Sequence, residues 1–172
     1  RSTGASVSDL LRHKAKGSIL QEYHESGYNY RMTDIQAAMG IVQMRKIDAM
    51  LAQRAQQARR YDELIADIDD LATPFVPAWV EPSFSSYCVR TRRGCPLSAS
   101  ELVQSMAREN ISCRHGIQPL HREPVFAGKA RLGGLTETES AARETLFLPI
   151  FPGLTAEQQR TVVDGLKRSL AR

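Results

Sequence analysis

The sequence is poor in cysteine and contains no long apolar run. Its three cysteines are an odd number, and no Cys-x-x-Cys pair occurs. A disulfide framework is therefore not expected, and a reducing cytoplasm is the location that this pattern favours. No stretch of about 18 apolar residues is present, so we predict no membrane-spanning helix and no membrane partner.

The sequence also lacks a block of like charges. Lys and Arg number 23 and Asp and Glu number 19, which gives a formal net charge of +4. The two signs alternate closely in the stretch "RKIDAMLAQRAQQARRYDELIADIDD", a pattern typical of solvated helix faces. The densest basic stretch, "RTRRG", is short. We therefore expect no nucleic-acid partner.

A metal site is not expected either. Cys113, His115 and His121 lie close together in the sequence and carry possible ligand atoms. Their spacing matches none of the usual zinc-binding patterns. We therefore assign no residue to a metal.

A long helical pattern dominates the first half of the chain. Thr33 and Gln36 have the spacing of a capping box, and apolar residues then recur every three or four positions. An unbroken helix over 33–69 would exceed about 50 Å, which is longer than a small domain is wide. We expect a helix, straight or bent, that connects two packed bodies. Its first turns are apolar on two faces and are predicted to be the more buried part, including Ile35, Met39 and Val42.

Short strands and helices alternate in the remainder of the chain. Capping-box spacings at Ser98 with Glu101 and at Thr155 with Gln158 predict two helix starts, and a further helix is predicted over 136–146. Extended segments are predicted at 84–92, 111–115 and 147–151. The order indicates a small antiparallel or mixed sheet covered by helices, which is an α+β fold.

Polar and aromatic residues crowd the loop before the long helix, in "ESGYNYRMTDIQ". The N–H groups at a helix start favour an anion, Asn29 offers an amide donor, and Arg31 can hold a phosphate or carboxylate by two hydrogen bonds. Alternatively, the tyrosines pack and the arginine pairs with a nearby carboxylate. The spacing alone leaves both interpretations open.

A second candidate is His121 in the loop "GIQPLHREPVF", which lies between two predicted elements. Such loops often carry functional groups. A lone histidine is more often a surface or packed residue than a catalytic one. The motif therefore needs further support.

Three stretches in order resemble the DegT/DnrJ/EryC1/StrS family of pyridoxal-phosphate-dependent sugar aminotransferases. They are "GYNYRMTDIQAAMGIVQMRKID", "GIQPLHREPVF" and "LFLPIFPGLTAEQQ". The opening "RSTGAS" is similar to the family segment that follows the cofactor lysine, although Thr3 stands where the family usually has histidine. The resemblance covers most of residues 27–170.

The resemblance implies the C-terminal part of an aspartate-aminotransferase-like, fold type I enzyme. Residues 1–32 would be the mostly looped tail of the large cofactor domain. Residues 33–69 would be the inter-domain helix, and residues 70–172 the small C-terminal α+β domain. Family members are homodimers with active sites at the subunit interface, so the resemblance also implies a homodimer.

Individual roles follow from the same resemblance. Asn29 matches the asparagine that reaches the cofactor phosphate of the partner subunit, and Arg31 would lie beside it. His121 matches the histidine that lines the sugar-nucleotide pocket, to which we also assign Tyr30. The family's covalent lysine and its acidic partner precede the matching segment, so no catalytic residue is expected in this chain. Its lysines match no such motif: Lys14, Lys16, Lys46, Lys129 and Lys167.

Three functions remain open at this point. The first is the transfer of an amino group, from glutamate, to a keto-sugar nucleotide in the full-length enzyme, with this polypeptide alone inactive. The second is a sugar dehydratase of the same family, in which histidine replaces the lysine. The third is a non-catalytic dimerisation module, which a test for bound cofactor would separate from both enzymes.

Overall fold

The computed structural model describes residues 14–15, 22–126, 128 and 133–171. The chain divides into two compact units, residues 1–47 and residues 48–172. The similarity predicted for the opening "RSTGAS" falls outside the described residues.

Unit 1 contains helix α2, Asp34–Met44. The Thr33 hydroxyl accepts the N–H of Gln36 at 3.3 Å, and the Gln36 side-chain oxygen accepts the N–H of Thr33 at 2.9 Å. This reciprocal pair is the predicted capping box, which is confirmed. It fixes the residue at which the helix begins.

The long helical pattern is divided between two helices. After α2, the N–H of Lys46 bonds to the carbonyl of Gln43 at 3.0 Å, which is an i to i−3 bond. Such bonds tighten the final turn and interrupt the α-helical ladder. The second helix, α3, spans Ile47–Ile65 and ends before the predicted residue 69. Neither glycine nor proline occurs at the break, so the sequence carries no ordinary signal for it.

The first turns of the helical region differ from their predicted burial within this chain. Ile35 is 76% exposed, Met39 is 62% exposed and Val42 is 46% exposed. In α3, by contrast, Ala58, Tyr61 and Ile65 are buried. Burial of the apolar faces of α2 therefore stays a prediction for the complete protein.

Unit 2 is built around a four-stranded sheet. The strands are β1 Leu71–Ala72, β2 Tyr87–Thr91, β3 Arg114–His115 and β4 Thr145–Leu148. Their order is β1-β2-β4-β3, and each neighbouring pair is antiparallel. The predicted α+β class is confirmed. Strand β1 was not predicted, and β4 begins earlier than the predicted extended segment at 147.

Three helices and two short 3-10 turns complete unit 2. The helices are α4 Ala99–Arg108, α5 Thr136–Glu144 and α6 Ala156–Leu170. The 3-10 turns η1 and η2 span Leu120–Arg122 and Pro124–Phe126. The capping boxes predicted for the starts of α4 and α6 are both present.

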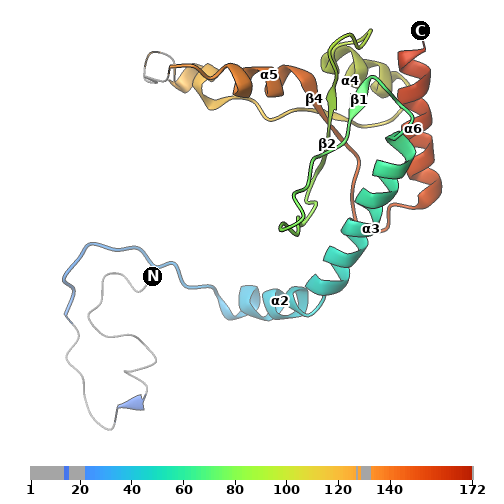
Figure 1. The fold of residues 1–172 in the computed structure, drawn as a ribbon. Coiled ribbons are helices and arrows are strands. Elements are labelled where there is room, and N and C mark those ends of the chain that lie inside the picture. Colours follow the sequence, from blue (N-terminus) through green and yellow to red (C-terminus); the bar gives the residue numbers. More distant parts are fainter. Residues whose placement is uncertain (1–13, 16–21, 127, 129–132, 172) are drawn as a thin grey trace. The chain divides into compact units, whose positions relative to one another are not determined.

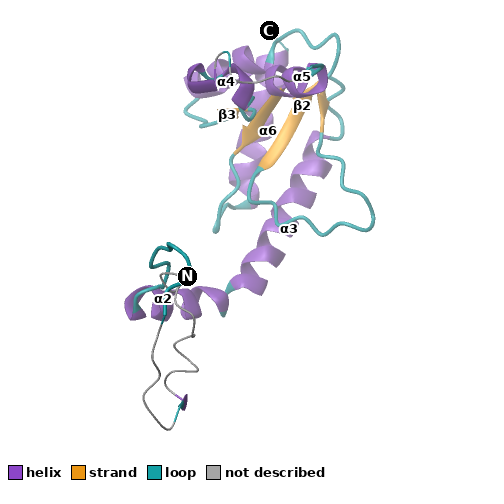
Figure 2. Ribbon diagram, turned by 90° about the vertical axis from the view of Figure 1, so that its left-hand side faces the viewer, coloured by secondary structure: helices purple, strands orange, loops and turns teal. Residues whose placement is uncertain are grey.

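The two faces of the sheet have different environments. Strand β2 buries every second side chain: Tyr87, Val89 and Thr91. Between them, Cys88 is half-buried and Arg90 is exposed, because successive side chains of a strand point to opposite faces. Figure 1 shows α6 beside α3, and Figure 2 shows the sheet from a second direction with α5 near its upper end. The core that these elements enclose includes Tyr61, Leu102, Met106, Leu146, Val163 and Leu166.

Within the described ranges, no helix combines the length and apolarity that a membrane span requires.

Candidate functional site

The loop of unit 1 holds the Asn29 side chain in one orientation. The backbone N–H of Arg31 donates to Oδ1 of Asn29 at 3.2 Å. The side-chain oxygen accepts this bond, and the NH₂ group keeps its donors available for another molecule. Tyr30 follows at 71% exposure, with its ring centroid 5.7 Å from that of Tyr28 and the planes tilted by 42°. The loop therefore presents an amide donor beside an exposed aromatic surface.

The start of α2 contributes less to an anion site than the sequence suggested. Its capping box already uses the N–H groups of Thr33 and Gln36. Asp34 also places a carboxylate in the first turn, which competes with an external anion for the positive end of the helix dipole. Binding of an anion at this loop therefore depends on side chains, above all on Asn29.

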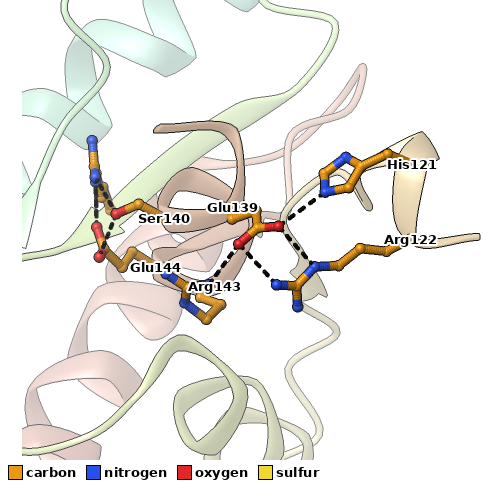
Figure 3. Close-up of polar contacts among 7 residues, drawn as sticks. His121, Arg122, Glu139, Ser140, Arg143 and Glu144 are labelled. Carbon is orange, nitrogen blue, oxygen red and sulfur yellow. Dashed lines mark hydrogen bonds and ion pairs between the residues drawn. The ribbon is translucent and has the colours of Figure 1, made fainter. Parts of the chain in front are cut away.

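In unit 2, His121 belongs to a cluster that is centred on a carboxylate (Figure 3). Nε2 of His121 lies 3.0 Å from Oε1 of Glu139, which is in the first half of α5. Arg122 meets the same carboxylate with one edge of its guanidinium, through Nε to Oε1 at 3.3 Å and Nη2 to Oε2 at 2.8 Å. Arg143 approaches Oε2 at 3.7 Å. The 3-10 turn η1 and helix α5 thus converge at one carboxylate.

The cluster keeps Glu139 ionised. Hydrogen bonds from His121, and then from Arg122, lower the pKa of the Glu139 carboxyl from its ordinary value. Each of these contacts stabilises the charged form of the acid. Glu139 is therefore an acceptor at neutral pH, and its partners must be donors.

A second cluster lies one turn later on the same helix. The Glu144 carboxylate accepts a hydrogen bond from Nε of Arg90 at 2.8 Å and another from the hydroxyl of Ser140 at 2.7 Å. The Ser140 hydroxyl, and then Arg90, lower the pKa of Glu144. This cluster ties α5 to β2 and contains no histidine, so it serves as a structural counterpart to the Glu139 cluster.

The third motif, "LFLPIFPGLTAEQQ", has a visible structural task. The Tyr61 hydroxyl donates to the carbonyl of Pro149 at 2.8 Å. The Gln57 amide donates to the carbonyls of Phe151 at 3.0 Å and Leu154 at 3.2 Å. Because a backbone carbonyl that is shielded from water needs a partner, these bonds from α3 fix the turn of the motif between β4 and α6.

An open groove of about 1000 Å³ lies on unit 2 beside this motif. One wall comes from β3 and the residues that follow it, and another comes from β4 and the first turns of α6. Polar and apolar groups both line it, including Arg114, His115, Gln118, Phe147, Gln158 and Thr161.

The structure separates the predicted residues into two groups. Asn29, Tyr30 and Arg31 lie together in unit 1, whereas His121 lies in unit 2. The sequence does not point to Glu139, because this residue is 18 positions from His121 and only the packing of α5 against η1 joins the two. In the part of the chain that the structure describes, no three His, Cys, Asp or Glu side chains gather as metal ligands.

Comparison with known proteins identifies relatives over nearly the whole chain. The model of the DegT/DnrJ/EryC1/StrS aminotransferase family matches residues 6–167. The dTDP-3-amino-3,4,6-trideoxy-α-D-glucose transaminase of Streptomyces venezuelae is 30% identical, over 94% of this chain and 42% of that protein. GDP-perosamine synthase of Caulobacter vibrioides is 30% identical, over 84% of this chain and 39% of that protein.

A solved structure supports the same relationship. Streptomyces venezuelae DesV superposes with a TM-score of 0.78 at 27% identity, over 95% of this chain and 43% of that one. The chain thus spans less than half the length of its relatives, between 34% and 44% in the curated proteins compared. The fold expected from the resemblance, part of a pyridoxal-phosphate aminotransferase, is confirmed. The chain belongs to the DegT/DnrJ/EryC1/StrS aminotransferase family, whose members include pyridoxal-phosphate-dependent aminotransferases.

Proposed function

We propose that the complete protein is an aminotransferase that moves an amino group from glutamate to a keto-sugar nucleotide. The observation that carries this proposal is the family match over residues 6–167, together with relatives whose names describe aminotransfer to nucleotide-linked sugars. In this proposal residues 1–32 belong to a large cofactor domain. Residues 33–69 connect the domains, and residues 70–172 form the small one.

The loop of unit 1 has the chemistry that the cofactor phosphate needs. A phosphate accepts hydrogen bonds, and the Asn29 NH₂ group is a donor that its contact with the Arg31 backbone leaves available. The Arg31 guanidinium supplies a permanent positive charge beside it. Pyridoxal phosphate, when bound, supplies the electron-withdrawing ring on which amino transfer depends. The task of Asn29 and Arg31 is to anchor its phosphate.

His121 and Tyr30 are the residues that we assign to the sugar nucleotide. Tyr30 presents an exposed aromatic ring and a hydroxyl group. The His121 side chain is 18% exposed and is held by Glu139. A ring face and fixed polar atoms suit a ligand that combines a nucleobase with sugar hydroxyls.

We further propose a cytoplasmic homodimer whose sites lie at the subunit interface, with Asn29 serving the cofactor of the partner subunit. The exposed apolar residues of α2, among them Ile35 and Met39, support an additional contact surface in the complete protein.

The test uses the full-length protein loaded with pyridoxal phosphate. Glutamate is supplied with a panel of dTDP-, GDP- and UDP-linked keto-sugars, and mass spectrometry measures 2-oxoglutarate and the amino-sugar nucleotide. The proposal expects both products in equal amounts with at least one sugar. A dehydrated sugar without amine transfer would favour the dehydratase alternative, and the absence of bound cofactor would favour a dimerisation module.

A further inference from the structure

The side chain of His121 is fixed through a chain of contacts that begins at Arg122. The guanidinium of Arg122 meets both oxygens of Glu139, at 3.3 Å and 2.8 Å. Two parallel contacts of this kind restrict rotation of a carboxylate more than a single one does. Oε1 of Glu139 is thereby held 3.0 Å from Nε2 of His121. Figure 3 shows both η1 side chains directed at this one carboxylate.

The chemistry of the contact determines which nitrogen of His121 carries the proton. Glu139 is ionised, because its hydrogen-bonded partners lower its pKa. A carboxylate only accepts hydrogen bonds, so Nε2 of His121 must be the donor. In the neutral ring the other nitrogen, Nδ1, is then an acceptor. Among the described residues, Nδ1 has no hydrogen-bond partner.

We propose that Glu139 is a positioning residue, which holds His121 as the Nε2–H tautomer so that Nδ1 accepts a hydrogen bond from a hydroxyl of the sugar substrate. The inference rests on the proposed function, because it takes His121 to be a substrate contact. It adds a residue outside the three recognised motifs and a defined direction for the hydrogen bond. A ring free to change tautomer would present a donor or an acceptor at this position, so the direction of the hydrogen bond to the hydroxyl would not be fixed.

The neighbouring Glu144 provides a matched control. It lies on the same helix, accepts from an arginine, and also has a lowered pKa. Its partners are Arg90 and Ser140 rather than a histidine. Glu144→Gln therefore removes a comparable charge from α5 while leaving the His121 contact in place.

The experiment uses the full-length enzyme and the variants Glu139→Gln, His121→Ala, their double mutant and Glu144→Gln. We expect Glu139→Gln to raise KM for the keto-sugar nucleotide about three- to tenfold, the loss of roughly one hydrogen bond. KM for glutamate and the absorbance of the bound cofactor should stay unchanged. His121→Ala should raise the same KM, and adding Glu139→Gln to it should have no further effect. Glu144→Gln should leave KM at the wild-type value.

A long-range proton–nitrogen NMR spectrum of His121 supplies a readout that does not depend on turnover. The wild type should show the Nε2–H tautomer, and Glu139→Gln should show a mixture of both tautomers. The Nδ1–H tautomer in the wild type would overturn the inference. The inference would also be overturned if Glu139→Gln raised KM for the keto-sugar nucleotide equally in the wild type and in His121→Ala. An unchanged KM in His121→Ala would overturn it as well. If the enzyme transfers no amino group to any sugar, the proposed function fails, while the tautomer measurement still decides the role of Glu139.

Discussion

The N–H of Gly116 donates to the carbonyl of Thr145 at 2.9 Å, where the end of β3 meets the start of β4. The Thr145 side chain occupies the position that a Cβ on residue 116 would need. Its hydroxyl is held by the carbonyl of Ala141 at 2.7 Å, so it cannot turn away without losing a bond. The close approach of these two strands therefore requires glycine at this position.

Gly116→Ala should destabilise unit 2 by about 1–3 kcal/mol, the usual range for overpacking a tight contact. Urea unfolding of the 172-residue chain, followed by circular dichroism, measures the change. Thr145→Ala in the same chain should recover part of the loss by removing the obstructing hydroxyl. Gly133→Ala is the control, because a Cβ there meets no atom within 4 Å. A urea midpoint for Gly116→Ala equal to that of Gly133→Ala would contradict the steric argument.

Ser98→Ala should cost about 0.5–2 kcal/mol of stability, because it removes the hydroxyl that caps α4. That hydroxyl accepts the N–H of Glu101 at 3.3 Å, and the Glu101 carboxylate accepts the N–H of Ser98 at 2.8 Å. Urea midpoints measure the effect. Ser112→Ala, at an exposed serine outside any helix, should be neutral. A cap variant as stable as this control would show that the box contributes nothing.

Stability should decrease in acid. Ser98 lowers the pKa of Glu101, and the contacts to Ser140 and Arg90 lower that of Glu144. A carboxyl whose pKa is lower in the folded state than in the unfolded state stabilises the fold at pH values above its unfolded pKa, which is near 4.5 here. That contribution is lost as the pH falls through the folded pKa. Unfolding free energy should therefore be level above about pH 5.5 and decrease below it. Glu144→Gln should reduce the slope below pH 5; an unchanged slope would exclude this carboxyl as a contributor.

Asn29→Ala in the complete enzyme should weaken pyridoxal phosphate binding roughly ten- to a hundredfold. A hydrogen bond to a charged group is typically worth about 1.5–3 kcal/mol, and each 1.4 kcal/mol is about tenfold in affinity. Titration of the apoenzyme with cofactor, followed by absorbance, measures the loss. Thermal stability without cofactor should change little, because Asn29 is exposed and supports no core.

A heterodimer tests whether Asn29 acts across the subunit interface. One subunit carries Asn29→Ala and the other lacks the cofactor lysine. If Asn29 serves the partner's cofactor, both defects fall in the same site, and activity should be near half of wild type. A heterodimer without activity would show that Asn29 serves the cofactor of its own chain.

The 172-residue chain alone should not bind pyridoxal phosphate covalently. None of its lysines lies in a motif that matches the family's cofactor lysine. Incubation with cofactor, borohydride reduction and mass spectrometry provide the measurement. Low labelling spread over several lysines is expected from surface amines. A stoichiometric adduct on one lysine would contradict the prediction.

Much of the fold could be predicted because the signals are local. The three capping boxes, at Thr33, Ser98 and Thr155, join groups three residues apart, and all three are present. The α+β order followed from alternating periodicities. The break after Met44 and the two-residue strand β1 were not predictable in this way. The break has no glycine or proline, and β1 exists only because it pairs with β2.

For the candidate site, the sequence by itself determined the family, through three ordered motifs, and pointed to Asn29, Tyr30, Arg31 and His121. It could not identify Glu139, because a contact across 18 residues depends on how η1 and α5 pack. Local hydrogen bonds and periodic side chains are encoded within a few residues. Tertiary structure alone decides the contact of His121 with Glu139 and the close approach of Gly116 to Thr145. Each depends on a group from a distant segment, the Glu139 carboxylate of α5 in one case and the Thr145 residue of β4 in the other.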